Sequence, residues 1–156
     1  MSVLEAGSAV PDFSLGKADG TRFTNEDLQG ATTVLVFYPF AFSPVCTDQF
    51  QIYEEVLSDI SSRDAVIYGV SCDATPSQTA FIEKLNVTIP HLSDFEPKGA
   101  ACEAFGVLHP GGFPERALVV VGPDGKVAWS YQADSPGDLP GANLIFDGLD
   151  AVGADS

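Results

Sequence analysis

The residues best suited to chemistry lie in the segment "PFAFSPVC", residues 39–46, directly after the apolar run "TVLVFY". Ser43 is a favourable N-cap and Pro44 suits the first helical position, so we predict that Cys46 lies in the first turn of a helix. Unpaired N–H groups and the helix dipole favour negative charge there, and we therefore expect a readily ionised, reactive thiol. The alternative is that Cys46 only begins the apolar face of that helix.

The elements that must position this cysteine alternate between strand and helix patterns. We predict a hairpin over 12–24 with its turn near Asp19-Gly20, strands at 33–38, 65–71, 116–122 and 126–132, a short extended segment at 89–94, and helices over 24–30, 46–60, 76–85, 97–106 and 141–152. Strands joined through helices run parallel, whereas a hairpin adds an antiparallel pair. The order predicts an α/β, thioredoxin-like fold, with a mixed central β-sheet flanked by helices on both faces, in one domain over residues 1–156. The junction at residues 38–46 then lies at the carboxyl end of a strand, where open α/β sheets bind ligands.

Composition excludes several classes of protein. The 156 residues include seven Lys and Arg against 22 Asp and Glu, a formal net charge of −15, which disfavours nucleic-acid and membrane partners. The acidic residues are dispersed, as in proteins of a high-salt cytoplasm, although an ordinary acidic protein is the alternative. No apolar run reaches ~18 residues, no signal-peptide pattern opens the chain, and three cysteines do not make a disulfide scaffold. We therefore expect a cytoplasmic protein.

Several motifs resemble the peroxiredoxins, the alkyl hydroperoxide reductase/thiol-specific antioxidant family. "FYPFAFSPVC" is similar to the signature in which a proline and a Thr or Ser precede the peroxidatic cysteine; these are Pro39, Ser43 and Cys46. The similarity continues through "GSAVPDFSL", "GVSCD", "LSDFEPKGAACEAFGV" and "RALVVVGPDGKV", with the "LSDF" segment most similar to one-cysteine proteins of the alkyl hydroperoxide reductase E type. The resemblance implies a thiol-dependent peroxidase that needs no cofactor and no metal.

The resemblance also assigns a catalytic arginine, which maps to Arg116. The residues support this, because Arg116 opens an almost wholly apolar strand and a buried guanidinium needs an anionic partner such as a Cys46 thiolate. A surface pair with Glu115 is the alternative. Gln49, three residues after Cys46, occupies a position that is often polar in the family, or it is a solvated helix residue. Thr is commoner than serine at position 43, so Ser43 keeps the hydroxyl but lacks the methyl group that restricts its rotamer.

The implied reaction is attack by the Cys46 thiolate on a hydroperoxide O–O bond, which gives sulfenic acid on Cys46. Donors aimed at the developing charge, Ser43 and Arg116 among them, matter more here than a general base. Pro39 would shield the thiolate from water. The aromatic residues Phe40, Phe42 and Phe113 could form an apolar wall suited to organic hydroperoxides, or they only pack.

Regeneration of the thiol is expected to need an external reductant. Typical two-cysteine peroxiredoxins have a resolving cysteine near the C-terminus, whereas no cysteine follows Cys102 here, and the position five residues after Cys46 is Gln51. We predict a one-cysteine cycle with a small-thiol or thioredoxin-like reductant, in a homodimer or larger homo-oligomer. Cys72 and Cys102 are interpreted as core thiols, and a bridge from Cys46 to either stays open.

Other functions fit the sequence less well. A thiol–disulfide oxidoreductase would normally have C-x-x-C, but its first position is Ser43. A Cys/His hydrolase would need His91 or His109 beside Cys46, and neither has a local signature. Metal binding by the cysteines and histidines lacks paired ligand spacing. A redox sensor that uses Cys46 without turnover remains the alternative to the enzyme.

Overall fold

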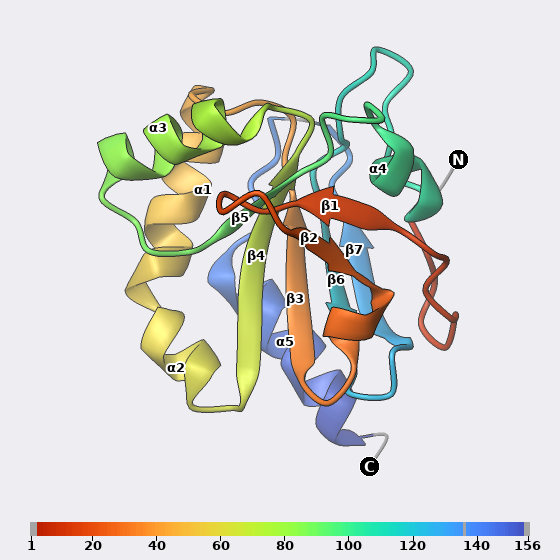
Figure 1. Cartoon of the computed structure of the whole chain (residues 1–156). Helices are drawn as coiled ribbons and strands as arrows, with labels where there is room; N and C mark the ends of the chain where they lie inside the picture. Colours follow the sequence, from red (N-terminus) through yellow and green to blue (C-terminus); the bar gives the residue numbers. More distant parts are fainter. Residues whose placement is uncertain (1–2, 136, 155–156) are drawn as a thin grey trace.

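The fold was described from a computed structural model, which covers residues 3–135 and 137–154. It contains strands and helices in the order that the sequence predicts (Figure 1). The elements are β1 (Ser14–Gly16), β2 (Arg22–Thr24), the 3₁₀ helix η1 (Asn25–Leu28), β3 (Thr32–Phe37), α1 (Pro44–Glu55), α2 (Leu57–Ser61), β4 (Ala65–Ser71), α3 (Thr75–Leu85), β5 (His91–Ser93), α4 (Ala100–Ala104), β6 (Ala117–Val121), β7 (Val127–Gln132) and α5 (Ala142–Ala154).

The strands form a single mixed sheet in the order β2-β1-β5-β4-β3-β6-β7. The central strand β3 pairs in parallel with β4 and antiparallel with β6, and β4 pairs in parallel with β5. The two predicted hairpins, β1–β2 and β6–β7, are both present and antiparallel. The predicted thioredoxin-like mixed sheet is therefore confirmed.

The pairing of β3 with β6 brings the two ends of interest together. Phe37, the last residue of β3, lies opposite Ala117, the first residue of β6. The chain leaves β3 toward Cys46 at one end of the sheet. Arg116, which directly precedes β6, lies at the same end. The register alone thus places the predicted nucleophile near the predicted cation, although 70 positions separate them in sequence.

Two apolar cores lie on opposite faces of the sheet. One contains side chains from the helices α1, α2, α3 and α5 together with Val34 and Val36 of β3. The other contains the neighbouring side chains Leu35 and Phe37 of β3, with residues from α4, η1 and the β1–β2 hairpin. This alternation is what a strand buried on both faces produces, since successive side chains point to opposite sides. Cys46 belongs to the first core, whereas Cys72 and Cys102 belong to the second.

Two helices have bounds in the structure that differ clearly from those predicted from the sequence. The continuous helix expected over 46–60 is interrupted at Val56, whose backbone angles (φ −108°, ψ 11°) are not helical, and it becomes α1 and α2. The helix expected over 97–106 is limited to α4, because Gly99 takes a positive φ of 78° that an α-helix does not accommodate. Residues 95–99 are turns instead.

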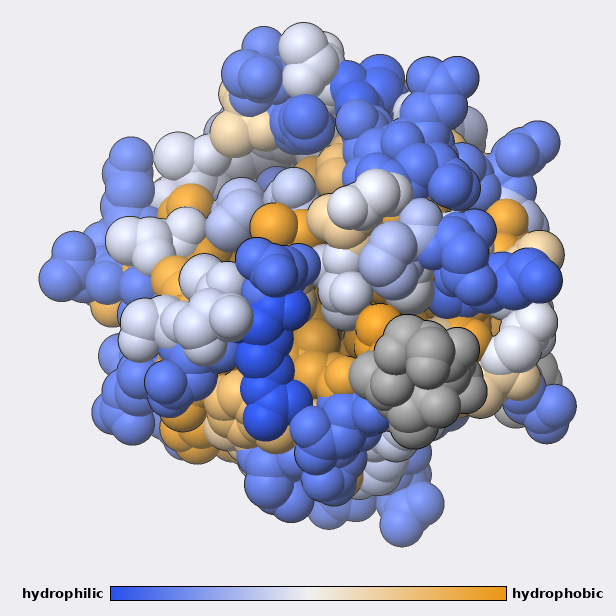
Figure 2. Space-filling view, turned by 90° about the horizontal axis from the view of Figure 1, so that it is seen from below, coloured by the Kyte–Doolittle hydropathy of each residue, from blue (hydrophilic) through white to orange (hydrophobic). Residues whose placement is uncertain are grey.

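The end of the molecule opposite the Cys46 segment is largely hydrophilic, with apolar patches between the polar side chains (Figure 2). This surface agrees with the strong excess of acidic residues. Among the described residues, no helix combines the length and the apolar character that a membrane crossing requires.

Candidate active site

The segment between β3 and α1 is held in place from the neighbouring strand. The Tyr38 amide donates to the Val70 carbonyl of β4 at 3.0 Å, which extends the pairing of β3 by one residue. The Ala41 amide donates to a carboxylate oxygen of Asp73 at 2.8 Å. Phe42 then adopts a φ of 70°, a conformation that is costly for a bulky side chain. This turn redirects the chain into α1.

The predicted helix start is confirmed. Ser43 is the N-cap of α1, Pro44 is its first residue, and the Ser43 hydroxyl oxygen accepts a hydrogen bond from the Cys46 amide at 3.4 Å. The Cys46 side chain therefore lies in the first turn, where the helix dipole favours negative charge. Because a hydroxyl that accepts one bond still carries its own hydrogen, Ser43 also keeps a donor at this position.

The Cys46 sulfur has a cationic partner. Nη2 of Arg116 lies 3.2 Å from Sγ of Cys46, and Arg116 precedes β6 directly, with its carbonyl accepting from the Ala133 amide at 2.9 Å. The side chains of both Cys46 and Arg116 are almost completely buried, with 0% and 2% of their surface exposed. The guanidinium therefore donates a hydrogen bond to the sulfur inside a site from which water is largely excluded. The alternative role for Arg116, as a surface residue, is wrong.

A chain of hydrogen bonds orients the guanidinium. Nη1 of Arg116 donates to the side-chain oxygen of Gln49 in a short bond, and the Gln49 amide nitrogen donates to the Tyr53 hydroxyl at 3.0 Å. Tyr53 in turn donates to the Pro140 carbonyl at 2.6 Å. Burial raises the pKa of Tyr53, which keeps the phenol protonated as a donor. Gln49 is thus fully buried and part of the site, not a solvated residue.

Tyr53 is the site residue that the sequence analysis did not assign. Cys46, Gln49 and Tyr53 follow an i, i+3, i+7 spacing, which places them on one face of the helix. The polar groups of Gln49 and Tyr53 on the face of the cysteine were the signal that could have identified Tyr53 as a site residue.

Aromatic residues lie in and beside the segment between β3 and α1. Phe40 and Phe113 pair with ring centroids 4.9 Å apart, and Phe42 packs edge-on against Phe81 at 5.3 Å. Phe40 and Phe42 are nevertheless about half exposed, at 49% each. Pro39 is buried and lines a surface cavity of about 400 Å³ together with Phe40. The structure therefore puts apolar side chains around the segment that precedes Cys46, as expected.

The histidines have other partners. Nδ1 of His91 lies 2.7 Å from the Tyr38 hydroxyl, and burial lowers the pKa of His91 to about 3, so its imidazole is neutral. Nδ1 of His109 accepts from the Gly111 amide at 2.9 Å, and its ring stacks on Phe113. These contacts leave the Cys/His hydrolase without a base oriented toward Cys46.

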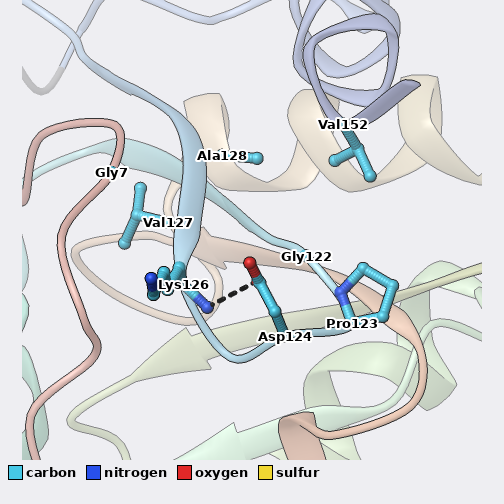
Figure 3. A pocket seen from close by; sticks show the side chains of 8 residues that line it. All are labelled: Gly7, Gly122, Pro123, Asp124, Lys126, Val127, Ala128 and Val152. Carbon is cyan, nitrogen blue, oxygen red and sulfur yellow. Dashed lines mark hydrogen bonds between the residues drawn. The ribbon is translucent and has the colours of Figure 1, made fainter. Parts of the chain in front are cut away.

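A second cavity, of about 350 Å³, lies at the opposite end of β6 (Figure 3). Its walls come from the β6–β7 turn, from Gly7 and from Val152 of α5, and its main polar contact joins the Lys126 amide to the Asp124 side chain at 3.0 Å. None of these groups is a nucleophile next to a base or cation. The chemistry of the molecule is therefore expected at the Cys46 end of the sheet.

A buried cysteine at a helix start, facing an arginine on a thioredoxin-like sheet, defines a class of thiol-based redox enzymes. Comparison with known proteins specifies the class further. The model of the AhpC/TSA family matches residues 6–130. Alkyl hydroperoxide reductase E of Mycobacterium bovis is 29% identical over 154 residues, which cover 97% of this chain and 100% of that protein. A protein named putative peroxiredoxin bcp, from Coxiella burnetii, is 31% identical over 67% of this chain and 68% of its own length.

Solved structures of peroxiredoxins have the same fold as this chain. The peroxidoxin BcpB of Mycobacterium tuberculosis superposes with a TM-score of 0.81 at 26% identity, over 98% of this chain and 99% of that one. AhpC of Enterococcus faecalis gives 0.85 at 26% identity, over 99% and 94%. The chain therefore belongs to the AhpC/TSA family. It is a peroxiredoxin, a thiol-dependent peroxidase that takes a hydroperoxide and a thiol reductant.

Proposed function

We propose that Cys46 is the peroxidatic residue and that it reduces hydrogen peroxide and organic hydroperoxides in a one-cysteine cycle. The Cys46 thiolate attacks one oxygen of the O–O bond, and the sulfur–oxygen bond forms as the O–O bond breaks. The departing oxygen takes a proton and leaves as water or alcohol, and sulfenic acid stays on Cys46. The observation that carries this proposal is the 3.2 Å contact between Nη2 of Arg116 and Sγ of Cys46 inside a buried site.

Charge moves from sulfur to the departing oxygen during this step, so fixed donors lower the barrier. Arg116 is held by Gln49 at one nitrogen and reaches the sulfur with the other, which leaves it oriented before substrate arrives. Ser43 accepts from the Cys46 amide and directs its own hydroxyl hydrogen toward the peroxide. Pro39, buried at the end of the β3 extension, keeps water away from the sulfur.

Access to Cys46 requires a local movement, because its side chain is completely buried. The segment that precedes it contains the strained Phe42, whose φ of 70° costs on the order of 1–3 kcal/mol. Phe42 is also half exposed, and its ring contacts Phe81 edge-on. We propose that this turn opens transiently to admit the peroxide, and that the surrounding phenyl rings favour hydroperoxides with an apolar substituent.

The sulfenic acid on Cys46 is returned to the thiol by an external small thiol or a thioredoxin-like protein. Cys72 and Cys102 lie in the core on the other face of the sheet and contact each other, which supports a cycle that does not use them as resolving residues. We further propose that the chain acts in the cytoplasm, in keeping with its strongly acidic composition, and that it forms a homodimer or larger homo-oligomer.

The test is peroxide consumption under an excess of a small thiol. The intact chain should consume many equivalents of hydrogen peroxide, whereas the Cys46→Ser variant should lose this sustained turnover and consume at most about one equivalent per chain. Consumption by the intact chain that stops after one equivalent would instead identify a redox sensor. Retained turnover in Cys46→Ser would place the chemistry elsewhere in the molecule.

A further inference from the structure

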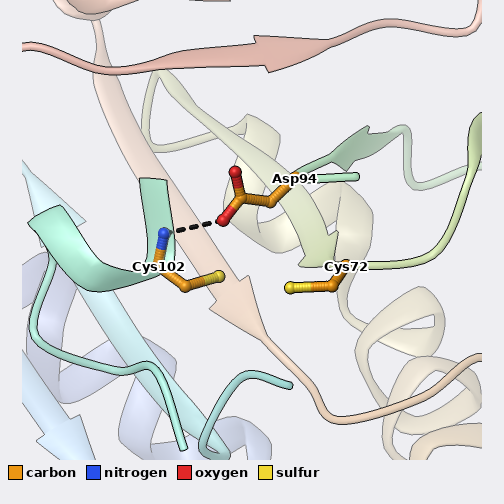
Figure 4. A group of neighbouring side chains, drawn as sticks. All are labelled: Cys72, Asp94 and Cys102. Carbon is orange, nitrogen blue, oxygen red and sulfur yellow. Dashed lines mark hydrogen bonds between the residues drawn. The ribbon is translucent and has the colours of Figure 1, made fainter. Parts of the chain in front are cut away.

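The other two cysteines of the chain form a pair. Cys72 follows the last residue of β4, and Cys102 lies in the short helix α4. Their sulfur atoms and a carboxylate oxygen of Asp94 all lie within 4.8 Å of one another. Figure 4 shows the two thiol groups pointing toward each other across the space between β4 and α4. Both residues are free thiols in this structure.

The two thiols differ in their access to solvent. Cys102 is completely buried, whereas Cys72 keeps 7% of its surface exposed. Cys72 lines the cavity of about 400 Å³ that Pro39 and Phe40 also line, together with Lys98. A small oxidant that enters this cavity therefore meets Cys72 first, with Cys102 directly behind it.

The surroundings of the two thiols shift their pKa values in opposite directions. The neighbouring Cys102 thiol lowers the pKa of Cys72 and outweighs burial and the Asp94 carboxylate, which raise it, while Lys98 adds a smaller lowering effect. The Cys72 thiol, followed by burial, raises the pKa of Cys102 well above its usual value. The lower pKa thus belongs to the cysteine that lines the cavity, as in thiol pairs where one sulfur attacks and the other resolves.

A metal site is less well supported by the same atoms. Both oxygens of Asp94 already accept hydrogen bonds, one from the Ala101 amide at 3.0 Å and one from the Cys102 amide at 2.8 Å. Only three potential ligands gather here among the described residues, whereas a closed tetrahedral zinc site uses four. The carboxylate instead satisfies the first N–H groups of α4 and so fixes Cys102 next to Cys72.

We propose that Cys72 and Cys102 form a second peroxide-reactive site, which closes to an intramolecular disulfide independently of Cys46. The Cys72 thiolate attacks the O–O bond of a hydroperoxide, becomes sulfenic acid and releases water or an alcohol. The Cys102 thiol then attacks the Cys72 sulfur, the S–S bond forms, and the sulfenic oxygen leaves as water with the thiol proton. Two thiols and one hydroperoxide thus give one disulfide, one alcohol or water, and one further water.

The local backbone suits this closure. Cys72 lies in a bend between β4 and α3, outside the paired strand, and α4 has only five residues. A disulfide brings the sulfur atoms to about 2 Å, so one or both cysteines must shift from the reduced arrangement. Neither residue has to leave a long helix or a central strand to do so.

The test uses the full-length Cys46→Ser variant, in which only the paired thiols remain. The reduced protein is treated with excess hydrogen peroxide, quenched with acid and an alkylating agent, and weighed by mass spectrometry. We expect the loss of two hydrogen atoms, no free thiol, and a proteolytic fragment that joins Cys72 to Cys102. Unchanged, fully alkylated protein would overturn the proposal, and so would a disulfide that forms only when Cys46 is present.

Two further variants separate the roles of the thiols. In Cys46→Ser with Cys102→Ala, the Cys72 sulfenic acid should persist and be captured by dimedone. In Cys46→Ser with Cys72→Ala, Cys102 should stay unmodified while the protein is folded, as checked by its unfolding transition. Capture on Cys102 first would contradict the assigned order. Stoichiometric zinc that is retained by the untreated protein and lost in both variants would also overturn the proposal in favour of a metal site.

The proposed Cys72–Cys102 site does not depend on Cys46. An experiment that refutes this site can therefore be distinguished from one that refutes the proposed peroxidase cycle. The Cys46→Ser variant tests the pair alone, and Cys72→Ser tests the peroxidase alone. The latter should keep its peroxide turnover with an external thiol.

Discussion

Cys46 and Cys102 are equally buried, but their surroundings differ. Cys46 lies in the first turn of a twelve-residue helix, with a guanidinium 3.2 Å from its sulfur. Cys102 lies in a five-residue helix, where its nearest polar partners are another thiol and a carboxylate. Burial without a positive charge disfavours a thiolate, whereas burial beside a fixed cation favours it. The comparison teaches that the charged group beside a thiol, and not the depth of its burial, decides which thiol reacts first.

The strongest test of this contrast removes each sulfur in turn. We expect Cys46→Ser to lower peroxide turnover by at least about a thousandfold, because replacing a nucleophile removes the covalent step itself. Steady-state peroxide consumption with a small thiol measures this. Cys72→Ser and Cys102→Ser are the matched controls and should retain turnover. The opposite pattern would reverse our assignment of the two regions.

The second test replaces the arginine that contacts the Cys46 sulfur. Arg116→Met should slow the oxidation of Cys46 by about 10²–10³-fold, the typical cost of losing one donor aimed at a transition state. Arg116→Lys should recover only part of the rate, because a lysine does not reproduce a two-nitrogen contact with Gln49 and Cys46. The measurement is rapid-mixing kinetics of the reduced protein with hydrogen peroxide.

Lys98→Met is the control for Arg116→Met, because it also removes one positive charge. Lys98 lies near Cys72, so its loss should leave the oxidation rate of Cys46 within a few-fold of the original. If Lys98→Met slowed Cys46 as strongly as Arg116→Met does, the effect of both would come from net charge and not from local contact.

The third test concerns a buried base on the Cys46 side. Burial lowers the pKa of His91 from 6.5 to about 3, so the unfolded chain binds a proton between these values that the folded chain does not. The free energy of unfolding should therefore fall as the pH decreases from about 6.5 toward 3, with a contribution of at most about 1.4 kcal/mol per pH unit. Denaturant unfolding at several pH values measures this, and His91→Gln should reduce the slope. An identical slope in the variant would mean that His91 is not held neutral.

The smallest effect is expected at the helix cap. Ser43→Ala removes the oxygen that accepts from the Cys46 amide, which should cost about 1 kcal/mol of stability. It should also slow Cys46 oxidation, since the hydroxyl donor is lost. Ser43→Thr keeps the hydroxyl and should preserve both properties, as measured by unfolding and by peroxide kinetics. Equal losses in the Ala and Thr variants would exclude a role for the hydroxyl.

The sequence predicted most of the fold because local signals and chain order agreed. The N-cap at Ser43 and the proline after it defined the start of α1, and the apolar runs over β3, β4 and β6 defined the central strands. Cys46 was identified from its place at this junction. Arg116 was supported by its isolation at the start of an apolar strand, and the antiparallel register then placed it beside the sulfur.

Other features depended on contacts that span the chain. The bond from Tyr53 to Pro140 joins residues 87 positions apart, and no local pattern encodes it. The pairing of Cys72 with Cys102 likewise requires α4 to pack against the end of β4, so their interpretation as separate core thiols was incomplete. The late start of the expected 97–106 helix arose from the left-handed conformation of Gly99 at its N-cap, which the presence of a glycine allows but does not predict.

The central claim is that Arg116 and the start of α1 make the Cys46 sulfur the first to react. The direct measurement mixes the reduced protein with one equivalent of hydrogen peroxide, traps sulfenic acid with dimedone, and locates the adduct by mass spectrometry. We predict an adduct on Cys46, with Cys72 and Cys102 still reduced at that stage. Consumption of the peroxide with Cys46 unmodified would contradict the account.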